Sequence, residues 1–339
     1  MVMSPRESGK YIAKLSKNVQ IDNHSIEKLA EHIFKAIVEN GYKISSWKQT
    51  ELHPDKADEK AIDWIFLIDS LNFSFWSNNP FYVLHKGRRW GGYFGLCAAI
   101  ERAMNDGIPI TDPNFYKEIS LDQLQHILRT NNSGEPVEFP MIEERLEILH
   151  SHGKILCEKY DGSFVNCIKR CDKSAVKLLS TIIENFPSFR DEAEFEGKRV
   201  SFYKRAQILI GDIWACFENK ELGHFVDIDQ LTIFADYRVP QILAYEGVLK
   251  YSQELKSRLQ DLSILTSGER DEIEIRGTTI EACELLLQAI KKKFVRANMP
   301  CPDMLNAITL DYYLWNCRLN GGDLIDKAIQ FHRQRSIYY

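Results

Sequence analysis

The sequence predicts a mainly α-helical protein that forms a single domain over residues 1–339, with one small β-hairpin element in its N-terminal half. Apolar residues recur at helical spacing through most of the chain, whereas only one stretch has the pattern of a hairpin. No internal repeat and no long Pro- or Gly-rich linker separates independent domains. Within the single domain we expect an N-terminal part, residues 1–135, that carries the β element, and a helical part, residues 136–339.

Helices are predicted first on either side of residue 50. Apolar residues occupy one helical face over residues 26–38, with Ser25 as the N-cap and Gly41 as the stop. Residues 58–71 open with acidic residues and then continue at helical spacing. A third helix is expected to follow the glycine pair at 91–92.

The hairpin is predicted over residues 81–90, where two short β segments flank Gly87. Its basic residues are expected to face solvent. Further along the chain, Ser120 and Gln123 have the spacing of a capping box, which predicts the start of another short helix.

The second half of the chain contains most of the long apolar patterns. Helices are predicted over residues 141–160, 174–186, 202–217, 245–251, 278–294 and a final segment capped by Asp303. Asp212 lies inside the apolar pattern of residues 202–217. Because a buried carboxylate without a partner is costly or becomes protonated, we expect Asp212 to have a polar partner.

Composition limits the classes of protein that this chain can belong to. With 44% hydrophobic and 27% charged residues, it is typical of a globular protein with a sizeable core. Its net charge of −5 argues against a protein that grips long nucleic acid through the phosphates. Eight scattered cysteines without a Cys-x-x-Cys pair, and the lack of an apolar N-terminal or membrane-spanning stretch, predict a cytoplasmic protein with no membrane partner.

The motifs of nucleotide-binding loops, zinc proteases and serine hydrolases are missing, and we expect neither a metal nor a cofactor. The most informative stretch is instead residues 234–243, in which Asp236 lies between Phe234 and Tyr237 and shortly before Pro240. The local pattern alone favours an N-cap with core aromatics around it, because Asp is common before a helix. Carboxylates among aromatic rings also suit glycosidic bond cleavage, in which the sugar becomes cationic.

Several segments together resemble one known family. Pro5-Arg6-Glu7-Ser8, residues 234–243, residues 311–315 and the final Tyr338-Tyr339 are similar to segments of the queuosine salvage protein family, so the likeness covers nearly the whole chain. Members of that family hydrolyse queuosine 5′-monophosphate and release the base queuine. The resemblance implies an architecture similar to helix-hairpin-helix DNA glycosylases, which also place an Asp at the start of a helix under the sugar.

The resemblance also implies a catalytic role for Asp236. It could stabilise the cationic sugar, orient water as a base, or act as a nucleophile, and the sequence does not distinguish these roles. Phe234 is expected to stack on the base, and Tyr237 either stacks or belongs to the core. Asp212 and Asp311 are expected to accept hydrogen bonds from the base.

The remaining candidates are basic or weakly supported. Lys204, Arg205 and Arg238 are candidates for binding the 5′-phosphate, and each could instead be an ion-pair partner of a nearby acid. His53 lies in a looser match to the family pattern. Arg276 also lies in a family-like segment and is expected to support structure.

Two other classes of function remain open from the sequence. The chain could be a noncatalytic carrier of the modified nucleotide, or a tRNA-associated factor. A glycosylase that acts on intact tRNA or DNA would need a long cationic track, and the short basic clusters at 88–89, 169–170 and 291–293 do not supply one. We therefore expect a small nucleotide as the partner of this protein.

Overall fold

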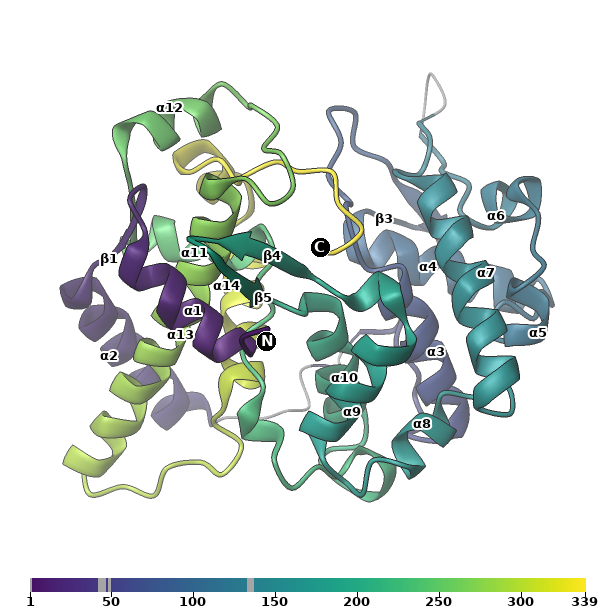
Figure 1. Ribbon diagram of the computed structural model, residues 1–339, viewed down its shortest axis with the longest axis horizontal. Helices are drawn as coiled ribbons and strands as arrows, with labels where there is room; N and C mark the ends of the chain where they lie inside the picture. The colour runs from purple at the N-terminus through teal and green to yellow at the C-terminus, as the bar shows by residue number, and fades with distance from the viewer. Residues whose placement is uncertain (1, 42–46, 48–49, 133–136) are drawn as a thin grey trace.

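The computed structural model describes residues 2–41, 47, 50–132 and 137–339, and its architecture is mainly helical (Figure 1). The first helices are α1 (Pro5–Leu15), α2 (Asn23–Asn40), α3 (Glu59–Ser70), α4 (Gly92–Asn105), α5 (Pro113–Tyr116) and α6 (Leu121–Ile127). The later helices are α7 (Ile142–Lys159), α8 (Val165–Lys169), α9 (Ala175–Asn185), α10 (Lys204–Cys216), α11 (Arg238–Tyr245), α12 (Gln253–Gln260), α13 (Arg270–Arg296) and α14 (Ala307–Ala328). Short 3₁₀ turns cover Pro187–Phe189, Glu221–Gly223 and Ile228–Gln230.

In the described part of the chain, the strands form three antiparallel pairs. These are β1 (Val19–Ile21) with β6 (Leu249–Tyr251), β2 (Val83–His85) with β3 (Arg88–Trp90), and β4 (Glu192–Phe195) with β5 (Lys198–Ser201). The β2–β3 pair confirms the hairpin predicted at residues 81–90, and its turn residues Lys86 and Gly87 have φ of 48° and 75°. The β4–β5 hairpin lies in the second half of the chain, where we had predicted no strands.

The buried apolar side chains form two large clusters. One cluster draws mainly on α3 to α10, and the other on α1, α2 and α11 to α14. Helices α1 and α2 therefore pack against α13, and Figure 1 shows these first helices beside the green helices of the second half. The two ends of the chain thus build one cluster together.

The last residues of the chain connect the two clusters. Residues 330–339 run from the side of α12 toward the segment that follows α3, as the yellow end of the ribbon shows (Figure 1). At one end, the backbone N–H of Leu265 donates to the carbonyl of Arg333 at 2.7 Å. At the other end, the N–H of Ser74 donates to the carbonyl of Tyr339 at 3.0 Å.

Several predicted helix starts are confirmed and others are wrong. Asp58, Ser120 and Ser174 cap α3, α6 and α9 through their side chains. The cap of α2 is Asp22, which accepts from the N–H of Ser25 at 2.7 Å, so the assignment of Ser25 as cap was three residues late.

Three predictions near the C-terminus also need correction. The expected helix at residues 245–251 does not form, because α11 ends at Tyr245 and the following residues pair with β1 as strand β6. Thr278 is not a cap, since α13 already begins at Arg270. The last helix is capped by Asn306, whose side chain accepts from the N–H of Thr309, and not by Asp303.

Among the described residues, none of the helices combines the length and the apolar character needed to cross a membrane. Seven of the cysteines are free thiols, namely Cys97, Cys157, Cys167, Cys171, Cys283, Cys301 and Cys317.

Candidate active site

A cavity of about 770 Å³ is lined by residues from both clusters. Eight of the nine residues that we had named as candidates for catalysis or substrate binding line this cavity, namely His53, Lys204, Asp212, Phe234, Asp236, Tyr237, Arg238 and Asp311. Arg205 does not line it. The guanidinium of Arg205 donates instead to backbone carbonyls, including that of Ser70 at 2.6 Å, which makes Arg205 a structural residue.

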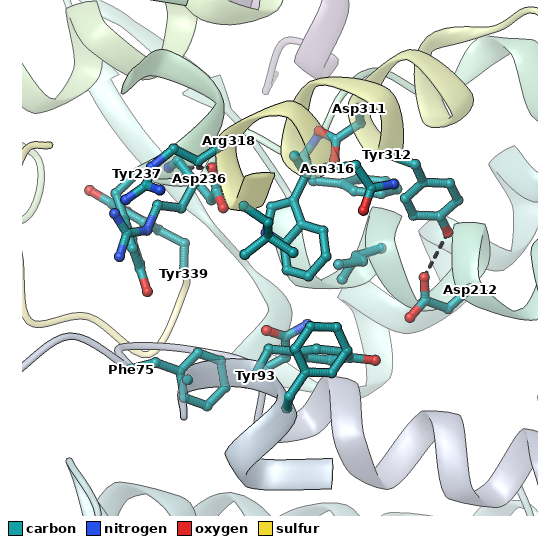
Figure 2. Close-up of a pocket in the computed structure, with 18 of the residues that line it drawn as sticks. Phe75, Tyr93, Asp212, Asp236, Tyr237, Asp311, Tyr312, Asn316, Arg318 and Tyr339 are labelled. Carbon is teal, nitrogen blue, oxygen red and sulfur yellow. Dashed lines mark hydrogen bonds between the residues drawn. The ribbon is translucent and has the colours of Figure 1, made fainter. Parts of the chain in front are cut away.

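Asp236 lies two residues before α11, and its two carboxylate oxygens have different surroundings. Oδ1 accepts from the backbone N–H of Arg238 at 2.7 Å and of Val239 at 2.9 Å, so the predicted capping role is confirmed. For Oδ2, no hydrogen-bond donor is found within the described ranges. The side chain is half-buried and lines the cavity, close to Tyr237 and Arg318 (Figure 2). One oxygen therefore fixes the carboxylate while the other is available to a ligand.

The backbone that carries Asp236 is held by a buried ionic group. Arg276 donates from Nε to the carbonyl of Ala235 at 2.9 Å. Its two Nη atoms bind Asp191 at 2.9 and 2.5 Å, and one also binds Glu272 at 3.1 Å. All three ionic side chains are almost fully buried. Arg276 thus supports the structure of the site, as predicted, by fixing the residue before Asp236.

Lys204 begins α10 and lies against the same end of the cavity. Its backbone N–H donates to Asp191 at 3.2 Å, and its Nζ donates to the carbonyl of Asn72 at 3.3 Å. Burial lowers the pKa of Lys204, and the negative charges of Asp236 and Asp69 oppose that shift. The charges of Asp236 and Asp69 therefore both favour the ammonium form of Lys204.

Two further carboxyl groups line the cavity from α14 and α10. Asp311 accepts the backbone N–H of Phe234 at 2.9 Å, and burial together with the charge of Asp236 raises the pKa of Asp311 well above its usual range. Asp212 accepts from the Tyr312 hydroxyl at 2.7 Å, which is the partner that we expected this carboxylate to have. Burial raises the pKa of Asp212 to about 6.

His53 lies in the cavity wall with both ring nitrogens occupied. Nδ1 lies 2.7 Å from the carbonyl of Trp47 and must donate to it, so Nε2 accepts from the Tyr93 hydroxyl at 2.9 Å. Burial lowers the pKa of His53 to about 4, which keeps the ring neutral at pH 7. His53 is therefore suited to hold Tyr93 in place.

Aromatic side chains give the cavity flat walls. The ring of Phe234 meets Tyr312 edge-on with 6.2 Å between centroids, and Tyr237 lies 5.2 Å from Phe331. In Figure 2, Phe75 and Tyr93 lie on one side of the cavity and the polar Asp311 and Asn316 on the opposite side. A flat ring with polar edges fits between two such walls.

Several residues that line the cavity were not predicted from the sequence. Tyr312 and Trp315 belong to the family-like segment 311–315. Phe75 lies after α3 in residues 72–76, where polar and aromatic side chains alternate. Arg318 follows Asp311 by seven residues, so two helical turns place both on one face of α14. That periodicity could have identified Arg318, whereas no local signal distinguishes Tyr93.

Arg318 and Arg238 share their hydrogen-bond partners. Arg318 donates to Gln241 Oε1 and to Asp326 Oδ1, both at 2.6 Å. Arg238 donates to the same two oxygens at 3.0 and 3.3 Å. We call these two residues the arginine pair. In the parts of the chain that the structure describes, no group of three His, Cys, Asp or Glu residues is arranged to hold a metal ion.

Comparison with known proteins identifies relatives over the full length of the chain. The family model described as "Queuosine salvage protein" matches residues 52–339. A protein of Bos taurus is 46% identical over 343 residues, which cover 100% of this chain and 99% of the relative. A Mus musculus protein is 45% identical over 99% of both chains, and a Schizosaccharomyces pombe protein is 36% identical over 98% of this chain and 99% of its own length. Each of these relatives bears the name queuosine 5′-phosphate N-glycosylase/hydrolase.

Proposed function

This chain belongs to the queuosine salvage protein family, and from that membership we propose that it hydrolyses queuosine 5′-monophosphate. The bond between the sugar C1′ and the base nitrogen breaks, and its electron pair leaves with the base. Water supplies a hydroxyl to C1′ and a proton to the departing base. The products are queuine and ribose 5-phosphate, which makes the protein a hydrolase of the N-glycosidase class.

The observation that carries this proposal is the arrangement of Asp236. Its Oδ1 is fixed by two helix N–H groups, and its Oδ2 has no donor among the described residues. As the base departs, the sugar gains oxocarbenium character, and a fixed carboxylate stabilises that charge without having to reorganise. The ammonium of Lys204 lies near Asp236, whose negative charge opposes the lowering of the pKa of Lys204 by burial.

The chemistry of the leaving group explains why the protein needs polar side chains that bind the base. Queuine is a 7-deazaguanine, so the ring nitrogen that purine glycosylases often protonate is replaced by carbon. We propose that Asp311 and Asp212 bind the base edge or the cationic aminomethyl side chain. An approaching cation would stabilise the ionised form of both carboxyls, whose pKa values burial has raised.

The shape of the cavity supports one orientation of the nucleotide. Asp236, Tyr237 and Arg318 lie together at one end, and Asp212 with Tyr312 lies at the other (Figure 2). We propose that the base enters the Asp212 end, with Phe234 against the ring, while the ribose 5-phosphate occupies the Asp236 end. Tyr237 packs on Phe331 and closes the wall there. His53 acts through Tyr93.

Three wider features of the protein are part of the same proposal. We propose that the 339 residues act as one domain, related in architecture to helix-hairpin-helix DNA glycosylases; the helical fold and the Asp at a helix start support this relation. The net charge of −5 supports a small nucleotide over duplex DNA or intact tRNA. Seven free thiols support a reducing, cytoplasmic location.

Incubation of the purified protein with queuosine 5′-monophosphate tests the proposal. We expect the protein to release queuine and ribose 5-phosphate in equal amounts without added metal or cofactor. Chromatography measures both products. Binding of the nucleotide without any release of base would identify a carrier instead. Faster release of base from intact tRNA than from the mononucleotide would show that the substrate is the polymer.

A further inference from the structure

A carboxylate that the proposed reaction leaves unused lies behind the cavity wall. Asp69 belongs to the last turn of α3, and its side chain is fully buried. Its Oδ1 accepts from the Nδ2 of Asn72 at 3.0 Å, whereas its Oδ2 has no hydrogen-bond partner in the part of the chain that the structure describes. Asn72 lines the cavity and Asp69 does not, so Asp69 can act on a ligand only through its neighbours.

Stability does not explain this carboxylate. A buried carboxylate with a single hydrogen bond costs free energy, because it has lost most of its hydration. Burial raises the pKa of Asp69 well above its usual range, and the charge of Asp212 raises it further. The hydrogen bond from Asn72 and the positive charges of Lys204 and Arg205 favour the ionised form. A costly carboxylate beside a cavity indicates a functional role.

Asn72 connects Asp69 to Lys204. The Nζ of Lys204 donates to the backbone carbonyl of Asn72 at 3.3 Å and lies 3.5 Å from its side-chain Oδ1. The amide of Asn72 can turn its oxygen toward the ammonium only while its Nδ2 points the other way, and Asp69 accepts from that Nδ2. Asp69 thus fixes the orientation in which Asn72 binds Lys204.

Lys204 lies among charged groups from several elements. These groups are Asp69 on α3, Arg205 on α10, Asp311 on α14, Asp236 before α11 and, at the backbone N–H, Asp191 before β4. Burial lowers the pKa of Lys204, and the charges of Asp236 and then Asp69 oppose that shift most. A sugar that becomes cationic attracts Asp236 and repels the nearby ammonium. Asp69 lies outside the cavity, so its charge still stabilises Lys204 at that moment.

We propose that Asp69 is a positioning residue for the proposed reaction: through Asn72 it holds the ammonium of Lys204 in place while the sugar becomes cationic. The inference rests on the proposed function for the identity of the reaction. Because Lys204 lies beside Asp236, its displacement would change the electrostatic field in which the glycosidic bond breaks. Asp69 therefore affects the chemical step although it does not line the cavity.

Kinetics of D69N on queuosine 5′-monophosphate, over the neutral and alkaline pH range, test the proposal. The amide oxygen of asparagine can still accept from Asn72, so D69N removes the charge and keeps the shape. We expect kcat to fall roughly 10- to 100-fold with KM within about 3-fold of wild type. The decline of kcat at high pH should begin roughly one pH unit lower, because Lys204 loses its proton more easily without the charge of Asp69.

D63N is the matched control. Asp63 lies on the same helix, and its carboxylate accepts from the hydroxyl of Ser163 and from the N–H of Phe164, both at 2.9 Å. None of these three residues lines the cavity, so D63N should leave kcat, KM and the pH profile unchanged. Urea unfolding checks folding, and D69N should unfold at the same urea concentration as wild type or a higher one, since it removes a costly buried charge.

N72A tests the connection between Asp69 and Lys204. It removes the amide that joins them and should lower kcat at its pH optimum about as far as D69N does. If Asp69 acts through Asn72, the double variant D69N/N72A should be no more than about 3-fold slower than the slower single variant. Effects of the two substitutions that multiply, or a kcat–pH profile of D69N that matches wild type, overturn the assignment.

An NMR titration of protein isotope-labelled at lysine Cε provides a readout that does not require turnover. The signal of Lys204, assigned by its absence from K204M, should have a titration midpoint roughly one pH unit lower in D69N than in wild type. An unchanged midpoint overturns the role of Asp69. If the midpoint moves as expected and wild type yet releases no base from the nucleotide, the proposed reaction fails and the link between Asp69 and Lys204 stands.

Discussion

Replacement of Asp236 by asparagine removes one negative charge from the cavity and leaves its hydrogen-bonding geometry almost intact. The amide oxygen of asparagine can still accept from the N–H groups of Arg238 and Val239, so the cap of α11 is retained. A carboxylate about 4 Å from a cationic sugar, at an effective dielectric constant near 20, is worth about 4 kcal/mol. Because about 1.4 kcal/mol corresponds to tenfold in rate, kcat should fall roughly a thousandfold.

Single-turnover release of queuine measures this chemical step, and calorimetry with queuine measures binding. We expect D236N to bind the base with an affinity close to that of wild type and to unfold at nearly the same denaturant concentration. D236A is the comparison, because it removes the cap as well as the charge and should cost about a further 1 kcal/mol of stability. A kcat for D236N within tenfold of wild type would refute the electrostatic role of this carboxylate.

Three further substitutions test other parts of the site. D212N should stabilise the protein by about 3 kcal/mol above pH 7, since the pKa of Asp212 is raised from 3.8 to about 6 and wild type loses stability as the pH rises through that window. R276M should lower the free energy of unfolding by roughly 3–5 kcal/mol, because it leaves two buried carboxylates uncompensated. G211A should raise KM and lower the free energy of unfolding by about 1–3 kcal/mol, since a Cβ would lie 2.8 Å from the buried ring of Phe234 and 3.2 Å from Ile308 and would force that ring to shift.

Urea unfolding at pH 4.5 and 7.5 measures the first two effects, and steady-state kinetics the third. The pKa of His53, lowered to about 4, makes wild type gain stability over an overlapping range of pH, so the difference between D212N and wild type isolates Asp212. If the difference in unfolding free energy between D212N and wild type does not change with pH, the raised pKa of Asp212 is contradicted. If R276M lowers the free energy of unfolding by less than 1 kcal/mol, the two buried carboxylates are not left uncompensated. An unchanged KM in G211A contradicts contact of Phe234 with the substrate.

Local patterns in the sequence predicted the helical class because most helices bury one apolar face, as α2 and α9 do. The β2–β3 hairpin was predictable from Gly87 and its flanking apolar residues. The β1–β6 pair was not, since it joins Val19 to Tyr251 through tertiary packing alone. The start of α13 was missed because its buried first turns carry charged residues whose partners come from distant segments.

The candidate site was predictable to the extent that its residues lie in segments similar to a known family. Eight of the nine candidate residues line one cavity, although the fold needed to bring His53 together with Asp311 is not visible in either segment alone. The arginine pair was harder to predict, because only the fold brings Arg318 next to Arg238. Both side chains donate to Gln241 and Asp326.

The extended stretch at residues 330–339 also closes part of the cavity wall. Ser74 donates through its hydroxyl to the carbonyl of Ser336, a residue 262 positions later, and Tyr339 itself lines the cavity. Without this stretch, the part of the cavity wall that Tyr339 forms would be open. Deletion of residues 330–339 should therefore weaken binding of the nucleotide as well as slow its cleavage.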